Sequence, residues 1–138
     1  MLGEIRKELV KEDRIILAVV YGGFLRSEVF RDVDLAVFTG YSVSPSEEVE
    51  FCETLSRRLE RAVGFPLDVR LLDYAPPGFR LSVLREGKVL LERRACLSVD
   101  LRAAASREIA DIRAKRAMIR SKLGREPRRV RSSGSDGA

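Results

Sequence analysis

The stretch Val20-Tyr21-Gly22-Gly23 is followed, after eight residues, by Asp32-Val33-Asp34-Leu35, and these two segments decide the fold. Glycines lack a Cβ, so the backbone N–H groups of a glycine turn can approach a phosphate closely. Residues i and i+2 of a strand point to the same face, so Asp32 and Asp34 would converge on one point. Two carboxylates repel each other unless a cation lies between them, and hard oxygen ligands suit Mg²⁺ or Mn²⁺. The pattern predicts metal-dependent chemistry on a nucleotide.

Strands and helices alternate on both sides of these segments. Short apolar or period-two runs predict strands over 15–20, 33–38 and 67–71, and a helix is expected over 3–12. The capping box Ser44-Pro45-Ser46-Glu47 opens a further helix, which Gly64 closes. Its apolar stripe consists of Cys52, Leu55, Leu59 and Val63.

A third carboxylate lies on the third predicted strand. Leu67, Val69 and Leu71 alternate with Asp68 and Arg70, so the two charged residues share one face of the strand. Asp68 can therefore join the pair described above.

The remaining carboxylate of this region, Asp73, fits no motif at the strand end and is expected at the surface. After it, 76–78 (Pro-Pro-Gly) is expected to form a loop, and two short elements, 81–84 and 89–91, flank a turn at 86–87.

The C-terminal part is expected to be one long helix, about 99–123, followed by a basic tail. Its predicted apolar face comprises Leu101, Ala105, Ile109, Ile112 and Ile119. Residues 113–138 hold nine basic and two acidic residues, so they carry the whole positive excess of the chain. We expect one domain over 1–123 and a disordered tail over 124–138. The tail has no interleaved aromatic residues, so it could attract nucleic acid through phosphates alone.

Composition narrows the possible chemistry and location. The chain of 138 residues has no His and two Cys, which argues against a zinc site or a His-based catalytic dyad. It has no apolar run near the ~18 residues that span a membrane and no signal-like N-terminus, so the expected compartment is the cytoplasm. It also lacks Asn and Gln, a tendency of thermophiles, and high-temperature origin is a hypothesis.

Three segments together resemble the minimal nucleotidyltransferases of the polymerase-β-like superfamily, and more narrowly the MNT proteins paired with HEPN partners. They are Tyr21-Gly22-Gly23, the stretch 30–37 around Asp32-Val33-Asp34, and Pro66-Leu67-Asp68-Val69; the runs 75–80, 83–90 and 92–93 add to the likeness. The resemblance covers about residues 13–94. It implies an α/β (α+β) fold in which helices flank a small mixed sheet, with the long C-terminal helix following.

The resemblance also implies an activity, the transfer of a nucleoside monophosphate from an NTP, ATP above all, to a hydroxyl. By this likeness Asp32, Asp34 and Asp68 are the catalytic residues and ligate the metal, Mg²⁺ or Mn²⁺. Asp68 also accepts the proton of the attacking hydroxyl. Gly22 and Gly23 shape the loop that holds the triphosphate, and Arg26 is a candidate phosphate contact, with a solvated arginine as the alternative.

One position departs from the family pattern, because Gly23 stands where these proteins usually have Ser. The missing hydroxyl removes a phosphate hydrogen bond, so the chain is expected to bind NTP more weakly.

Three hypotheses about function follow. The first is an antitoxin that adenylylates a HEPN-type toxin on a side-chain hydroxyl. The second is a catalytically weakened antitoxin or scaffold that acts by contact alone. The third is a stand-alone transferase that acts on a small hydroxylated molecule. Enzymes of that kind usually carry an extra helical domain that binds the substrate. Because the body is short for such a function, we also expect a homo- or hetero-oligomer, with the last helix as the contact.

Overall fold

The computed structural model describes residues 1–23 and 33–124 of the chain. The chain divides into two compact units, Met1–Ala105 and Ser106–Ala138. The first unit contains the sheet and the helices that pack on it, and the second continues the last helix.

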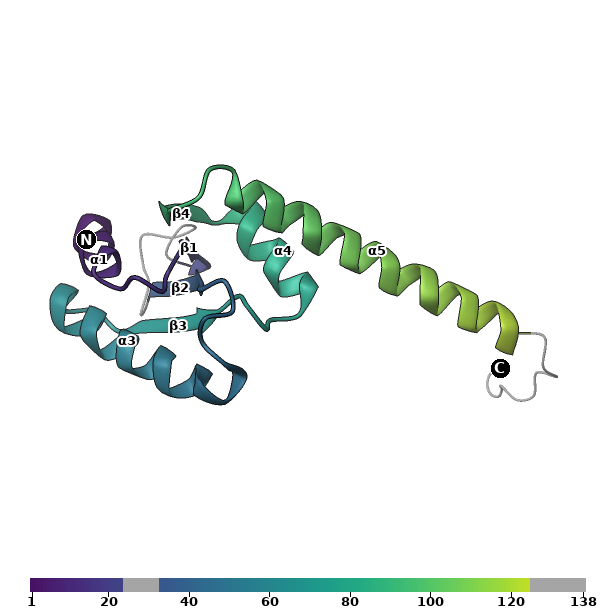
Figure 1. The fold of residues 1–138 in the computed structure, drawn as a ribbon, viewed down its shortest axis with the longest axis horizontal. Coiled ribbons are helices and arrows are strands. Elements are labelled where there is room, and N and C mark those ends of the chain that lie inside the picture. The colour runs from purple at the N-terminus through teal and green to yellow at the C-terminus, as the bar shows by residue number, and fades with distance from the viewer. Residues whose placement is uncertain (24–32, 125–138) are drawn as a thin grey trace. The chain divides into compact units, whose positions relative to one another are not determined.

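The first unit is built on a four-stranded sheet with the strand order β3-β2-β1-β4. Its strands are β1 (Leu17–Tyr21), β2 (Val33–Phe38), β3 (Leu67–Leu71) and β4 (Lys88–Glu92). β2 is parallel to β3 and antiparallel to β1, which in turn is antiparallel to β4 (Figure 1). The predicted mixed sheet is therefore confirmed.

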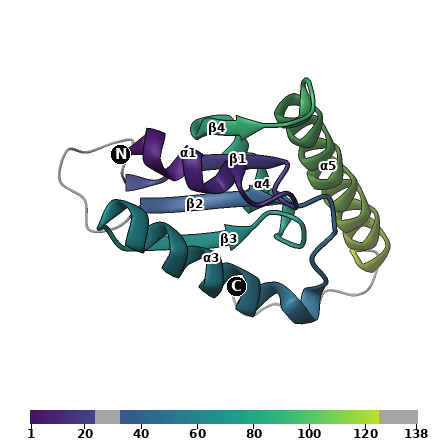
Figure 2. The same cartoon turned by 60° about the vertical axis from the view of Figure 1, so that its left-hand side comes forward.

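Helices cover both faces of this sheet. α1 (Leu2–Val10) and α3 (Glu48–Val63) lie on one face, and a short 3₁₀ turn, η1 (Pro45–Glu47), leads into α3 (Figure 2). α4 (Pro77–Glu86) and the beginning of α5 (Leu97–Leu123) lie on the other face. The predicted capping box is present at Ser44, and Gly64 ends α3 with a left-handed φ of 76°.

The alternation of side chains separates an apolar core from a polar row. Val33, Leu35 and Val37 of β2 are fully buried in the core that α1 and α3 close. Asp34 alternates with these residues and therefore lies on the opposite face, the one that α4 covers. In β3, Asp68 lies on that same face, between the buried Leu67 and Val69.

Two predictions for the region after β3 are wrong. Pro77 and Gly78 do not form a loop but begin α4, because proline at the first helical position loses no intrahelical hydrogen bond. The short element expected over 81–84 is the second half of the same helix. The second short element, expected over 89–91, is the strand β4.

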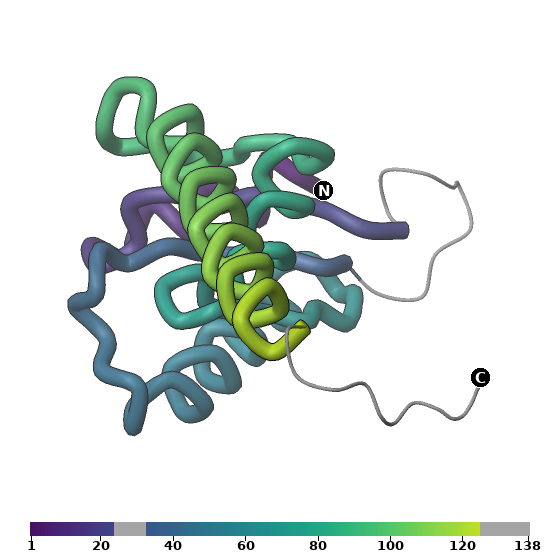
Figure 3. The backbone as a smooth tube through the Cα atoms, turned by 90° about the vertical axis from the view of Figure 1, so that its right-hand side faces the viewer, coloured from purple at the N-terminus to yellow at the C-terminus, as the bar shows by residue number. Residues whose placement is uncertain are grey.

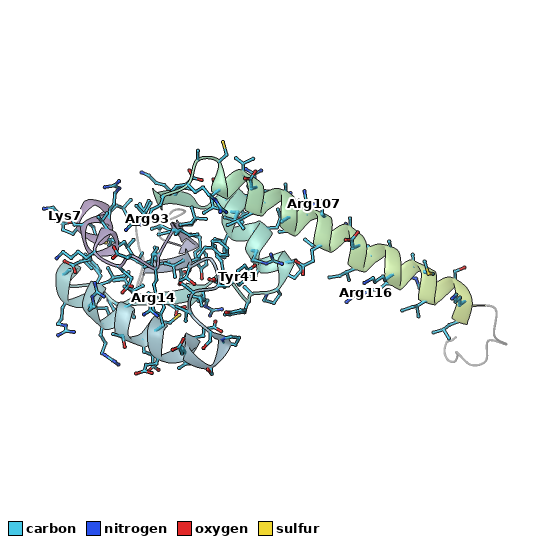
Figure 4. The ribbon with its side chains drawn as sticks, in the orientation of Figure 1. Lys7, Arg14, Tyr41, Arg93, Arg107 and Arg116 are labelled. Carbon is cyan, nitrogen blue, oxygen red and sulfur yellow. The ribbon has the colours of Figure 1, made fainter. Side chains whose placement is uncertain are left out.

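Asp73 is buried and structural, contrary to the expectation that it lies at the surface. It is 7% exposed, and its carboxylate accepts hydrogen bonds from the Thr39 N–H (3.1 Å), the Thr39 hydroxyl (2.9 Å) and the Tyr41 N–H (2.7 Å). Gly40 and Tyr41 both have a φ of 66° (Tyr41 is labelled in Figure 4). Asp73 therefore stabilises the left-handed turn after β2 by binding its backbone.

The last helix, α5, is continuous from Leu97 to Leu123, so the predicted long helix is confirmed (Figure 3). Leu97 and Ala105 are buried in the first unit, whereas Ile119 and Leu123 in the second unit are exposed. Among the described helices, none has the length and hydropathy that a membrane crossing requires. The expected tail lies, from residue 125 on, outside the described residues, and the domain boundary at 123 stays a prediction.

Gly87 provides a test of how α4 packs on the sheet. A Cβ at this position would lie 2.4 Å from Val19 Cγ1, 2.6 Å from the Val83 carbonyl oxygen and 2.8 Å from the Val20 carbonyl oxygen. Gly87→Ala should therefore lower the free energy of unfolding by about 1–3 kcal/mol, measured by urea denaturation. Gly78→Ala is the control, because no described atom lies within 4 Å of its Cβ position. Equal stability of both variants would contradict this packing.

Candidate functional site

The candidate site is a row of three side chains across three strands. β1 pairs Tyr21 with Asp34, and β2 pairs Asp34 with Asp68. Paired residues of neighbouring strands lie about 4.8 Å apart and point to the same face. The structure thus brings together two of the three predicted carboxylates, Asp34 and Asp68, at the edge of the region that α4 covers.

The backbone of Gly22 lies close to the carboxylate of Asp34, at a distance that leaves no room for a Cβ. Its φ is 81°, in the left-handed region that favours glycine, and a Cβ on it would lie 2.5 Å from Asp34 Oδ2. The backbone at the end of β1 can therefore lie directly against this carboxylate. Gly23 differs, because no described atom lies within 4 Å of its Cβ position.

Two of the predicted site residues, Asp32 and Arg26, lie outside the described residues. In the described part of the chain, no group of three or more acidic, Cys or His side chains is arranged to hold a metal. Asp34 and Asp68 nevertheless offer hard carboxylate oxygens from adjacent, paired positions, which is the donor chemistry that Mg²⁺ and Mn²⁺ prefer. The residues present therefore fit such an ion, and their role as ligands stays a prediction.

A cavity of about 340 Å³ opens between the glycine turn and α4. Gly22, Gly23 and Asp34 form one side of it, and Ser82 and Glu86 of α4 lie on the other. Tyr21, Phe79 and Val83 complete the lining. The two glycines, which are predicted to hold the triphosphate, and Asp34, which is predicted to bind the metal, thus border one cavity.

An arginine lies beside the carboxylate row. Arg70 Nε is 3.3 Å from Asp68 Oδ2, and its guanidinium lies over the Phe79 ring, 5.8 Å from the centroid. Phe79 in turn meets Tyr21 edge-to-face at 5.6 Å. Because Arg70 is well exposed, the ion pair can exchange with other partners of Asp68.

The charges of this row change the acidity of its members. Burial raises the pKa of Tyr21 to about 12, and the negative charge of Asp34 adds to the effect. Asp68 raises the pKa of Arg70, and Tyr21 adds to this. The row therefore keeps Tyr21 protonated and Arg70 charged at neutral pH.

Sequence reasoning missed Arg70, Phe79, Ser82 and Glu86. The period-two pattern did place Arg70 on the face of Asp68, so that signal was available. The other three residues belong to α4. Because this segment was expected to form a loop and short elements, no helical face was predicted that could bring them to the site.

Gly22→Ala tests the fit between the glycine turn and Asp34. The left-handed backbone alone should cost about 1–2 kcal/mol, and the carboxylate of Asp34 must also move to admit the Cβ. Gly23→Ala, the matched control, should change the free energy of unfolding by less than about 0.5 kcal/mol. Urea denaturation of both variants measures the difference, and equal losses would refute the proposed close approach.

Several solved structures are similar to this chain, among them the following three, at 17–19% identity. A mutant of the MntA–HepT toxin–antitoxin has a TM-score of 0.69 (17% identity, 89% of this chain and 98% of that chain). A toxin–antitoxin structure with AMP-PNP has a TM-score of 0.68 (19% identity, 88% and 97%). The MNT antitoxin in complex with the tri-AMPylated HEPN toxin of Shewanella oneidensis has a TM-score of 0.62 (17% identity, 89% and 98%). These likenesses show a shared nucleotidyltransferase fold.

Sequence comparison identifies the family. No curated protein is significantly similar to this chain. The family model described as polymerase beta, nucleotidyltransferase, matches residues 3–95, which is more than half of the chain and includes the glycine turn and all three aspartates. The chain therefore belongs to the polymerase-β nucleotidyltransferase family.

Proposed function

We propose that this protein is a metal-dependent nucleotidyltransferase that moves AMP from ATP to a side-chain hydroxyl of a HEPN-type toxin, as an antitoxin. The observation that carries the proposal is the packing of Gly22 against Asp34, with Asp68 paired next to it. A phosphate-binding turn and two carboxylates on one face are what phosphoryl transfer requires. Two of the similar structures, a toxin–antitoxin with AMP-PNP and a tri-AMPylated HEPN toxin in complex with an MNT antitoxin, support the substrate and the partner.

The proposed residues divide the work of one displacement. The acceptor oxygen attacks the α-phosphorus of ATP, the bond from that phosphorus to the bridging oxygen breaks, and pyrophosphate leaves with the electron pair. Asp68 takes the hydroxyl proton, while Gly22 and Gly23 hold the triphosphate by backbone N–H groups. Asp32, Asp34 and Asp68 would hold Mg²⁺ or Mn²⁺, which neutralises charge on the phosphate oxygens.

The partner is expected to contact the C-terminal helix. Ile112, Ile119 and Leu123 of α5 are exposed apolar residues in the second unit. Burying such side chains against a protein surface contributes about 25 cal/mol per Å² of apolar area. The same helix carries Arg107 and Arg116 (labelled in Figure 4), which suit an acidic rim on the partner.

One observation favours a second candidate function, a contact-only antitoxin with weakened catalysis. Gly23 lines the cavity but supplies no hydroxyl to the triphosphate. Loss of one hydrogen bond to a charged group weakens binding by up to about 3 kcal/mol. This alternative predicts a stable toxin complex without AMP transfer.

Titration calorimetry with ATP in roughly 5–10 mM Mg²⁺, repeated with EDTA, tests the main proposal. We expect binding that requires metal and is lost in Asp34→Ala, in Asp68→Ala and in the Asp32→Ala/Asp34→Ala double variant, because the remaining carboxylates would no longer hold the cation that neutralises the phosphate charge. AMP transfer to the toxin should fall at least about 100-fold in the same variants. Asp13→Ala, an exposed aspartate outside the site, is the control. Transfer that survives in Asp34→Ala would rule out the proposed metal site.

Gly23→Ser separates the two candidate functions. No non-neighbouring atom of residues 1–23 and 33–124 lies within 4 Å of the Gly23 Cβ position, so we expect the variant to fold normally and to tighten ATP binding by about tenfold through one added hydrogen bond. Calorimetry measures the affinity, and Gly23→Ala shows the effect of a side chain without a hydroxyl. If the protein is the proposed transferase, Gly23→Ser should also raise the rate of AMP transfer. A protein that still neither binds ATP nor transfers AMP would favour the contact-only alternative.

A further inference from the structure

β3 is an edge strand of the sheet, and half of its peptide groups point away from it. The Val33 N–H donates to the Pro66 carbonyl, and the Leu72 N–H donates to the Val37 carbonyl. Even-numbered residues from 66 to 72 therefore direct their backbone toward β2, and odd-numbered residues direct theirs outward. Since the strand order ends at β3, no other strand of the described sheet covers these groups.

α3 caps the outward groups at one end of β3 but not in the middle. The Leu67 N–H donates to Glu60 Oε2 at 2.9 Å, and the Leu67 carbonyl accepts from the Ser56 hydroxyl. The Leu71 backbone lies next to the Cys52 thiol of α3. For Val69, which lies between them, no hydrogen bond to the outward N–H or carbonyl is found within the described residues. Val69 is only 7% exposed, but its outward peptide groups are thus without a hydrogen-bond partner among the described residues, one residue from Asp68.

A groove of about 590 Å³ runs along this open edge. Asp68, Val69, Arg70 and Leu71 form its floor. One wall comes from α3, through Glu48, Val49, Cys52 and Glu53; the other comes from Tyr74, Ala75, Pro76 and Phe79. The groove therefore exposes an apolar and aromatic lining next to a strand edge that can accept another strand.

The groove is negatively charged on the α3 side. Glu48 and Glu53 line that wall, and Asp68 lies on the floor, whereas Arg70 is the one cation of the lining. The pKa of the Cys52 thiol is raised to about 11, first by burial and then by the charges of Glu48, Asp68 and Asp73. The carboxylates of the lining favour a cationic ligand.

We infer that this groove binds the acceptor segment of the partner as an added β-strand: an extended, cationic peptide whose backbone pairs with Val69 and whose hydroxyl side chain reaches Asp68. The inference rests on the proposed function and locates its second substrate. The cavity at Gly22 and Gly23 and the groove share Phe79 and lie at neighbouring carboxylates, Asp34 and Asp68. The triphosphate and the acceptor thus approach the carboxylate row from two sides. Strand addition supplies backbone hydrogen bonds for affinity, while the pockets for alternate side chains supply specificity.

A fluorescein-labelled nonapeptide with lysines at alternate positions around one central tyrosine is the probe, and its glutamate counterpart is the control peptide. Fluorescence anisotropy measures binding to the full chain without nucleotide. Val69→Pro removes the outward N–H and leaves the β2 pairing intact, and Val69→Ala reproduces the loss of side-chain volume. We expect the lysine peptide to bind about tenfold more weakly to Val69→Pro than to Val69→Ala, by the loss of one hydrogen bond. Equal affinity for the two variants, or stronger binding of the glutamate peptide, would overturn the inference.

A charge variant keeps the test decisive if Val69→Pro fails to fold. Glu48→Lys combined with Glu53→Lys should weaken binding of the lysine peptide about tenfold at low salt. Glu50→Lys is the control, because Glu50 lies on α3 outside the groove, and it should change the affinity less than about twofold. Sedimentation of the unlabelled chain identifies another occupant: self-association that Val69→Pro abolishes would assign the edge to a second copy and refute a partner segment.

The same peptide distinguishes failure of the groove from failure of the proposed function. With ATP and Mg²⁺, AMP transfer to the peptide tyrosine should follow peptide affinity across the variants. Peptide binding with the expected variant pattern but without transfer supports the groove and counts against the enzyme. Transfer that is equal in all groove variants supports the enzyme and refutes the groove.

Discussion

The pairing of β2 with both of its neighbours is the constraint on which the rest of the structure depends. Val33, Leu35 and Val37 are fully buried against α1 and α3, so β2 cannot slip by one residue without moving this apolar set to the wrong face. The register that buries them also fixes Asp34 opposite Tyr21 on one side and opposite Asp68 on the other. The apolar core therefore determines where the carboxylates lie, although they are on the opposite face of the sheet.

This placement brings negative charges together in a partly buried position, and the surrounding residues lower the free-energy cost of this arrangement. Arg70 lies 3.3 Å from Asp68, and Gly22 leaves room for the Asp34 carboxylate. Like charges at adjacent positions remain unfavourable without a bound cation. The site thus has the character of many functional sites, in which stability is lower than the fold could provide and the ligand supplies the missing interaction.

The sequence was sufficient for the parts of the fold that local patterns specify. The strands over 33–38 and 67–71, the capping box at Ser44 and the long last helix were predicted from periodicity and caps. Asp73 was misplaced because its partners, Thr39 and Tyr41, lie more than thirty residues away and no local pattern links them. α4 was missed because Pro-Pro-Gly indicates a loop unless Pro77 takes the first helical position. For the site, spacing indicated which carboxylates belong together, but the two cavities depend on packing between distant elements.

The two cysteines of the chain differ in environment, and this difference has a chemical consequence. Cys52 is partly buried in the groove wall, and its pKa of about 11 leaves almost no thiolate at neutral pH. Cys96 is exposed, in a left-handed turn (φ 61°) just before α5. Since alkylation proceeds through the thiolate and requires access, a maleimide modifies Cys96 well before Cys52. The natural sequence can therefore carry a single fluorophore next to its longest helix without any cysteine being removed.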